Sequence, residues 1–153
     1  MYWLASVSTI FFFTFILSII STKILIITAV ITFFIVMTIK YIAPYVYEKY
    51  GYSFTYFQLA VYFQGISTLL CLIFDEGILE IIASIICIIV DIVMLMVLYQ
   101  GLEHDKTQFN NGEYKEEDII IYSYDNAYFI SMNIMALFDN IAYLLSGDAK
   151  SGG

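Results

Sequence analysis

Long apolar runs with few or no charges restrict the fold of this chain more than any other feature. Four such runs stand out: residues 1–22, 24–47, 50–74 and 78–102. A transmembrane helix needs about 20 consecutive, mostly apolar residues, and each run meets that length. A fifth run, residues 126–147, is weaker because Asn133, Asp139 and Asn140 interrupt it. The pattern predicts about five membrane-spanning helices.

Strands are the alternative for sequences rich in Ile, Val, Phe and Thr. However, period-2 alternation is absent, and the runs exceed the roughly 9–11 residues of a membrane barrel strand. Short polar links between the first four runs make antiparallel neighbours. We therefore predict an all-α integral membrane protein with about five transmembrane helices, four strong and the fifth weaker, in an up-down bundle.

The chain divides into four parts by polarity. We predict a four-helix transmembrane bundle over residues 1–102 and an acidic polar loop over 103–125. A fifth helix over 126–147, spanning or interfacial, and a flexible tail over 148–153 follow. The first run lacks a positively charged start, so we expect it to be a retained helix rather than a signal peptide.

Composition agrees with the membrane interpretation. Hydrophobic residues make up 61% of the chain and charged residues 13%, against about 25% charged in soluble domains. The net charge is −8 and Arg is absent, which excludes the basic surface of a nucleic-acid binder. We expect the lipid bilayer and other membrane subunits as partners, with no nucleic acid and no soluble small-molecule substrate.

Residue patterns for covalent chemistry are missing. Cys71 and Cys87 lie inside apolar runs without metal-ligand spacing, so we expect reduced packing residues and no metal site. His104 stands alone in the polar segment, where we expect it to be solvated. There is no Gly-rich phosphate loop and no Ser-His-Asp set. We expect no cofactor and no catalytic residue in this chain, and its membership of an enzyme stays open.

Carboxylates inside the apolar runs are the first candidate functional residues. Asp91 follows Glu80 by eleven residues, about 16 Å along a helix, which places it near the middle of the membrane. A charge there costs at least about 2.5–3.5 kcal/mol. Asp91 is either a proton-relay group or a protonated acid bonded to a neighbouring helix. Asp139 poses the same question, but it is simply solvated if the fifth run lies on the surface. Glu80 lies at a membrane boundary, where it either takes up protons, contacts a neighbouring subunit or simply marks a helix corner.

The third run carries a polar patch of Gln58, Tyr62, Gln64 and Gly65. A glycine in a spanning helix allows close helix packing or a local distortion such as a π-bulge, and such bulges are frequent at functional sites. Tyr62, Gly65 and Gln58 are therefore candidate gating residues, with close packing as the structural alternative.

The stretch VYFQGISTLLCLIF, residues Val61–Phe74, resembles the third helix of subunit 6 of mitochondrial NADH:ubiquinone oxidoreductase, whose bacterial counterpart is the J subunit. That family has five spans and a motif of the kind Tyr-x-Gly-Ala-Ile-x-x-Leu-Phe. Tyr62 matches the tyrosine, and Ile66 and Leu69 match apolar positions. Gly65 is displaced by one position from the first glycine of the motif.

The resemblance implies a non-catalytic membrane subunit of a proton-translocating respiratory complex (complex I), in the mitochondrial inner membrane. The third helix around Tyr62 and Gly65 would gate a hydrated proton path that includes Gln58, Asp91, Glu80 and Asp139. The alternative is a small stand-alone protein of a bacterial inner membrane, such as a phage holin, an exclusion or immunity protein, or a homo-oligomeric pore. A purely structural accessory subunit is the third interpretation.

Overall fold

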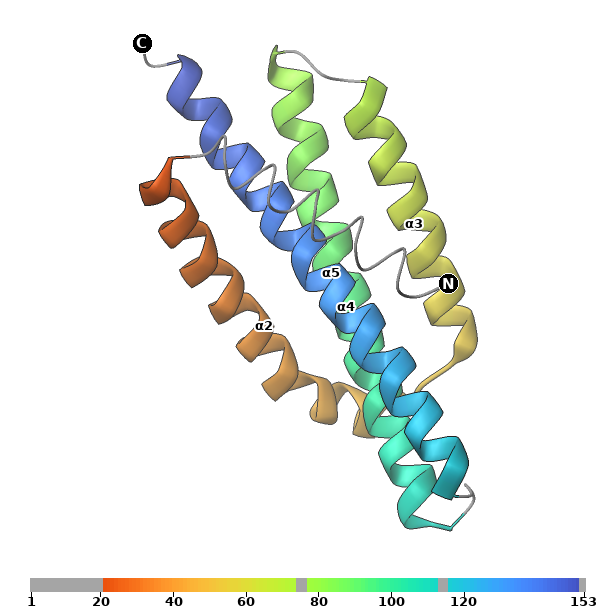
Figure 1. Cartoon of the computed structure of the whole chain (residues 1–153). Coiled ribbons are helices and arrows are strands. Elements are labelled where there is room, and N and C mark those ends of the chain that lie inside the picture. Colours follow the sequence, from red (N-terminus) through yellow and green to blue (C-terminus); the bar gives the residue numbers. More distant parts are fainter. Residues whose placement is uncertain (1–20, 74–76, 113–115, 152–153) are drawn as a thin grey trace.

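The structure is a computed structural model that describes residues 21–73, 77–112 and 116–151, and nearly all of these residues are helical (Figure 1). The elements are α2 (Thr22–Tyr50), α3 (Phe54–Ile73), α4 (Gly77–Asn110) and α5 (Glu116–Ser151). No strand occurs within these ranges. The prediction of an all-helical chain is confirmed for the part that the structure describes.

Helix α4 lies at the centre of the bundle, because it packs against α2, α3 and α5. Helix α5 also packs against α2, whereas α3 lies on the opposite side of α4 (Figure 1). Successive helices run in opposite directions, as the short links predict. Buried side chains of α4 can therefore contact α2, α3 or α5, depending on the side of the helix from which they project.

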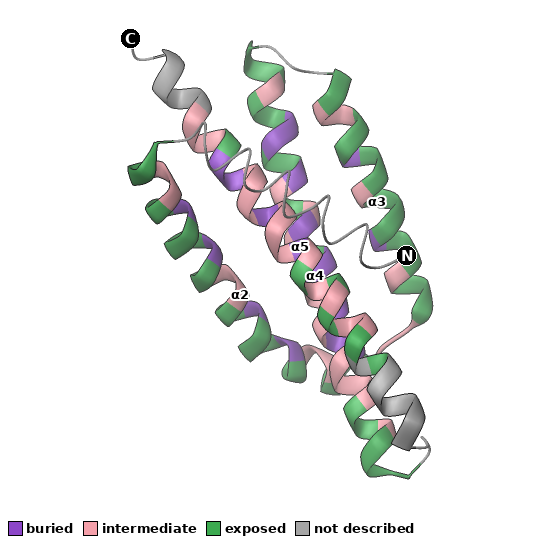
Figure 2. Cartoon of the chain, in the orientation of Figure 1, coloured by how far each residue is buried: buried purple, intermediate pink, exposed green. Residues whose placement is uncertain are grey.

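Each of the four helices contains a stretch that is long and apolar enough to cross a membrane, which in α5 is Tyr124–Ser146. Many large apolar residues of α2 and α3 are exposed, among them Phe33, Phe34 and Leu72. Figure 2 shows that most of both helices is exposed. Exposed apolar belts of this extent are typical of surfaces that contact lipid or another membrane helix. The fold is that expected of an integral membrane protein.

The core is a layer of apolar side chains at the level where α2, α4 and α5 meet. Ile39, Leu95, Leu137 and Ile141 form this layer, and Leu95 and Leu137 are fully buried. Ala60 brings α3 against a second cluster on α4. Figure 2 shows the buried residues gathered along α4 and along the facing sides of its neighbours.

The link between α2 and α3 is a tight turn. Gly51 has φ +71°, and its N–H donates to the Tyr47 carbonyl oxygen at 2.7 Å, which satisfies one of the last carbonyls of α2. Glycine is favoured at this left-handed position because it has no Cβ. The end of α2 curves toward α4 (Figure 1), so the turn delivers Tyr52 to the surface of α4.

The acidic loop predicted over residues 103–125 is wrong for most of its length. Helix α4 continues to Asn110, and α5 already begins at Glu116. Glu, Lys and Gln are good helix formers, and Thr107 and Lys106 bond back to Glu103 within the helix. The polar residues of this segment show where α4 and α5 extend beyond their apolar stretches. They do not show where either helix ends. Likewise, α5 runs to Ser151, through most of the predicted tail.

The first predicted span falls almost entirely on residues 1–20, outside the described residues. The four described helices therefore correspond to the second, third, fourth and fifth predicted spans. The weak fifth run, residues 126–147, is helical throughout and forms part of α5.

The two cysteines lie together between α3 and α4. The structure joins Cys71 to Cys87 as a disulfide, so the expectation that both are reduced packing residues is wrong. The antiparallel packing of α3 on α4 brings them together across a separation of 16 residues. The disulfide thus links α3 to α4.

Candidate functional site

Asp91 occupies the centre of the molecule, with 3% of its surface exposed. Both carboxylate oxygens accept hydrogen bonds from amide side chains. The Gln64 Nε2 atom donates to Oδ1 at 3.1 Å, and the Asn140 Nδ2 atom donates to Oδ2 at 2.7 Å. Gln64 belongs to α3 and Asn140 to α5, so a single carboxylate on α4 joins three helices.

Helical periodicity explains why Asp91 points inward. Six buried residues of α4 recur every three or four positions: Ser84, Cys87, Asp91, Met94, Leu98 and Gly101. The other buried residues of this helix, Ala83, Leu95, Val97 and Gln100, adjoin them in the sequence. The members before Asp91 are small, which permits close approach of neighbouring helices in a membrane. Asp91 therefore lies on the packed face, within reach of short amide side chains on both sides.

The partners of Asp91 are neutral. Among the described residues the one ion pair joins Lys106 to Glu103, near the end of α4 and away from Asp91. An ionised carboxylate accepts from both amide N–H groups. A protonated one can donate its O–H to an amide oxygen once that amide turns over. The arrangement can thus hold Asp91 with or without a proton.

A second polar contact links the same two helices nearer the start of α4. The Tyr143 hydroxyl donates to Glu80 Oε1. Tyr143 lies one turn after Asn140 on α5, and Glu80 lies three turns before Asp91 on α4. We use the name polar seam for Glu80, Asp91, Asn140, Tyr143 and the adjoining Gln64.

Four further oxygens are buried without a hydrogen-bond partner among the described residues: Thr28 Oγ1, Thr32 Oγ1, Asn133 Oδ1 and Asp139 Oδ1. Buried polar atoms of this kind are normally satisfied by internal water. Two of these oxygens belong to α2 and two to α5, so both helices carry buried polar groups besides the partners of Asp91.

The predicted residues of the third span lie elsewhere. Tyr62 is 71% exposed, Gln58 is exposed, and a Cβ added to Gly65 would meet no atom within 4 Å. All three face outward from α3, which is a regular α-helix from Phe54 to Ile73. Gln64 is the member of the patch that reaches Asp91.

Sequence reasoning identified Asp91, Glu80 and Asp139 as candidates, and the structure brings Glu80 and Asp91 onto the polar seam. It missed Asn140 and Tyr143 as their partners and did not single out Gln64. Gln64 and Asn140 are amide side chains within apolar helical runs, and this could have been noticed in the sequence. An amide in a membrane helix needs a hydrogen-bond partner, and Asp91 is an acceptor within another apolar run.

The other end of α4 carries a separate aromatic cluster. The Tyr47 hydroxyl lies 3.2 Å from His104 Nδ1, and the Tyr52 ring stacks on the same imidazole at 5.4 Å. His104 is therefore half-buried in α4 rather than solvated in a loop. Burial, and then the negative charge of Asp105, raise the pKa of Tyr52 above its ordinary value. The described residues contain no group of three His, Cys, Asp or Glu that could hold a metal ion.

Comparisons of the chain with known protein families, with curated proteins and with solved structures found no match. Fold and site alone define its class: in the part of the chain that the structure describes, four helices are suited to a membrane, and a carboxylate is buried where three of them meet.

Proposed function

We propose that this chain is a non-catalytic, membrane-embedded subunit that relays protons through the polar seam, with Asp91 as the group that takes up and releases the proton. The observation that carries this proposal is the Asp91 carboxylate, buried at the bundle centre and bonded to neutral amides from two other helices.

The energetics favour a group that can change its charge. An ionised side chain near the bilayer centre costs about 2.5–3.5 kcal/mol or more. A hydrogen bond to a charged group returns about 1.5–3 kcal/mol, and Asp91 accepts two. The two contributions are of similar size, so neither protonation state is prohibitive. A relay group requires that balance.

We propose further that the larger assembly is a proton-translocating respiratory complex, as the resemblance of Val61–Phe74 implies. Tyr62 and Gly65 lie on the outer face of α3, where a gating role requires a neighbouring subunit as the opposing surface. A homo-oligomeric pore needs its acids on an outer face that lines a shared lumen. Asp91 lies inside one chain, which favours the subunit over the pore.

Purification in mild detergent, followed by native electrophoresis and mass spectrometry, tests the assembly. We expect the chain to migrate in a very large particle with quinone-reducing activity. A homo-oligomer of this chain alone would contradict the respiratory assignment.

Replacement of Asp91 tests the relay separately. Asp91→Asn keeps the size of the side chain and one acceptor oxygen, replaces the other oxygen with an NH2 donor, and cannot ionise. We expect an assembled complex in which proton transfer, measured with a pH-sensitive dye in sealed vesicles, falls at least about a hundredfold, the lower end of the effect typical of losing a proton-transfer group. Ser131→Ala, on an exposed part of α5, is the control. Normal proton transfer with Asp91→Asn would remove the relay.

A further inference from the structure

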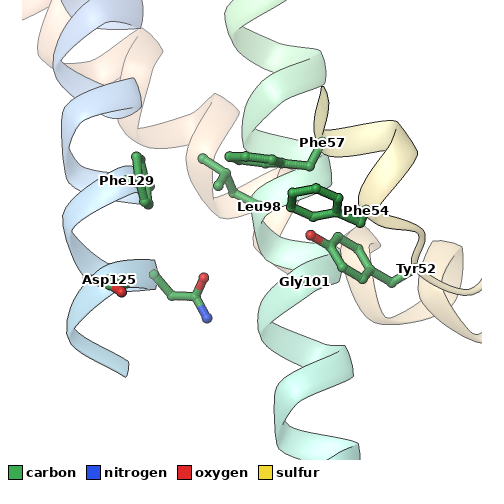
Figure 3. Close-up of a pocket in the computed structure, with 8 residues that line it drawn as sticks. Tyr52, Phe54, Phe57, Leu98, Gly101, Asp125 and Phe129 are labelled. Carbon is green, nitrogen blue, oxygen red and sulfur yellow. The ribbon is translucent and has the colours of Figure 1, made fainter. Parts of the chain in front are cut away.

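A cavity of about 120 Å³ lies near the end of the bundle where α3 begins. Eight residues line it: Tyr52, Phe54, Phe57, Leu98, Gly101, Asp125, Asn126 and Phe129. Figure 3 shows the aromatic rings of the α2–α3 link and α3 on one side, α5 on the other, and α4 behind. We propose that this cavity binds an organic ammonium cation such as a trimethylammonium group. The inference is independent of the proton relay.

The aromatic walls carry the first step. Phe54 and Phe57 stack with their centroids 5.9 Å apart, and Phe129 of α5 meets Phe57 edge to face at 6.2 Å. Tyr52 adds a fourth ring at the rim (Figure 3). A cation within about 6 Å of a ring centroid is attracted by the negative face of the ring. Four rings around so small a cavity keep any occupant within range of several of them.

Negative charge at the cavity selects the sign of the ligand. Asp125 lines the wall. Asp105 lies just behind it and accepts a 2.6 Å hydrogen bond from Asn126, another lining residue. The raised pKa of Tyr52, caused by burial and then by Asp105, reflects the same low-dielectric, negative surroundings. Carboxylates at and next to the cavity favour a cation over an anion as its occupant.

Apolar walls select the kind of cation. A hard metal ion needs several oxygen ligands, and the described residues provide no cluster of three acidic or histidine groups. Trimethylammonium groups are weakly hydrated and are recognised by aromatic cages. Contacts with Leu98 and the aromatic rings can therefore replace the hydration water of a trimethylammonium group, because that water is only weakly bound.

Gly101 keeps the cavity in shape. A Cβ added there would lie 3.3 Å from Cε2 and 3.4 Å from Cζ of Tyr52. The ring of Tyr52 therefore rests directly on the α4 backbone, a position that a larger residue would disturb. The apolar stretch of α5 begins at Tyr124, beside the lining residues Asp125 and Asn126. The cavity thus lies at the membrane boundary, the level of lipid headgroups.

Calorimetry with choline on the full chain in an uncharged detergent tests the site. The matched probe is dimethylbutanol, in which carbon replaces the charged nitrogen. We expect choline to bind at least about tenfold more tightly, because cation–π contacts in a desolvated site supply that difference. Equal binding of the two probes, or no binding of choline, would overturn the proposal without any mutation.

Variants locate the site. Phe57→Leu keeps an apolar wall but removes a ring, and we expect choline binding to weaken about fivefold. Phe63→Leu, on the exposed face of α3, is the matched control and should leave binding unchanged. Equal effects of the two substitutions would place choline elsewhere and overturn the assignment.

The natural source of the cation follows from nanodiscs made with phosphatidylglycerol or with phosphatidylcholine. Choline binding in phosphatidylglycerol discs alone would show that a lipid headgroup fills the cavity when one is present. Equal binding in both would show that the site takes a free ammonium ion from solution. Loss of binding in both would overturn the proposal for the membrane-embedded chain.

Discussion

Removal of the amide donors around Asp91 should destabilise the bundle by an amount that the structure allows us to estimate. The stronger contact is from Asn140, at 2.7 Å, and the weaker is from Gln64, at 3.1 Å. Hydrogen bonds to charged groups are worth about 1.5–3 kcal/mol in soluble proteins. Interhelical bonds in membranes average about 0.6 kcal/mol and reach about 1.7 kcal/mol. The burial of Asp91 places both bonds toward the upper part of the membrane range.

We therefore expect Asn140→Ala to lower the free energy of unfolding by about 2 kcal/mol, including lost packing, and Gln64→Ala by about 1 kcal/mol. Reversible unfolding in mixed micelles, followed by far-ultraviolet circular dichroism, measures these changes. Ser131→Ala, whose hydroxyl donates within α5 on an exposed surface, should change stability by less than about 0.5 kcal/mol.

A double-mutant cycle separates the hydrogen bond from packing. In an Asp91→Leu background, Asn140→Ala should lose only its packing contribution, which gives a coupling of about 1 kcal/mol between the two positions. Additivity within about 0.5 kcal/mol would show that the Asn140–Asp91 contact does not stabilise the bundle. The same result at Gln64 would refute the three-helix junction altogether.

Three further predictions concern other parts of the chain. Gly101→Ala should displace the Tyr52 ring and weaken choline binding severalfold in calorimetry, while unfolding of the bundle changes by less than about 1 kcal/mol. Maleimide labelling of the denatured, unreduced chain should modify neither Cys71 nor Cys87, and reduction should expose both and destabilise α3 on α4 by up to about 3 kcal/mol. The raised pKa of Tyr52 favours its neutral form in the folded chain, so this contribution to stability is present below the ordinary pKa of 10.0 and is lost as pH rises through the folded value. Ultraviolet titration of tyrosinate, with Tyr52→Phe as reference, should show that Asp105→Asn lowers this pKa only in part, because burial is the larger cause.

The apolar spans were predictable because the length of a membrane helix is fixed by the bilayer and can be counted in the sequence. The ends of the helices were not. Glu103, Lys106 and Thr107 are polar enough to suggest a loop, yet they continue α4 because their helix propensity is adequate and they bond within the helix. Polar residues indicate that a segment contacts water. A helix that extends beyond the apolar part of the bundle contacts water just as a loop does.

The junction at Asp91 illustrates what sequence could not provide. Asp91 itself was identified from its depth in an apolar run, but its partners lie 27 and 49 residues away. Which amide meets it depends on which faces of α3 and α5 turn inward. The outer faces are as apolar as the inner ones, so periodicity gives little guidance. Tyr62 was expected near the path from the polar patch and the resemblance of Val61–Phe74, whereas Gln64, two positions further on, reaches the carboxylate.

The core layer determines where a proton on Asp91 can go next. Leu95 and Leu137, both fully buried, lie one turn beyond Asp91 on the side away from Glu80, and Ile39 and Ile141 complete the layer. Leu and Ile side chains contain no group that can pass a proton onward. The hydrogen bonds of the polar seam join Glu80 to Tyr143 and Asp91 to Asn140, and these apolar side chains lie beyond Asp91.

Two routes remain past this layer: sideways through Gln64 on α3, or along α5 through the half-buried Asp139. Gln64 is hydrogen-bonded to Asp91, whereas no described hydrogen bond joins Asp139 to the polar seam. We therefore expect Gln64→Leu to slow proton transfer about as much as Asp91→Asn, and Asp139→Asn to leave it unchanged, in sealed vesicles with a pH-sensitive dye. The opposite result would place the route along α5 and would favour a path that crosses the membrane within this chain. The expected result directs the proton to the face of α3 that carries Tyr62 and Gly65, where a relay needs a second subunit to continue.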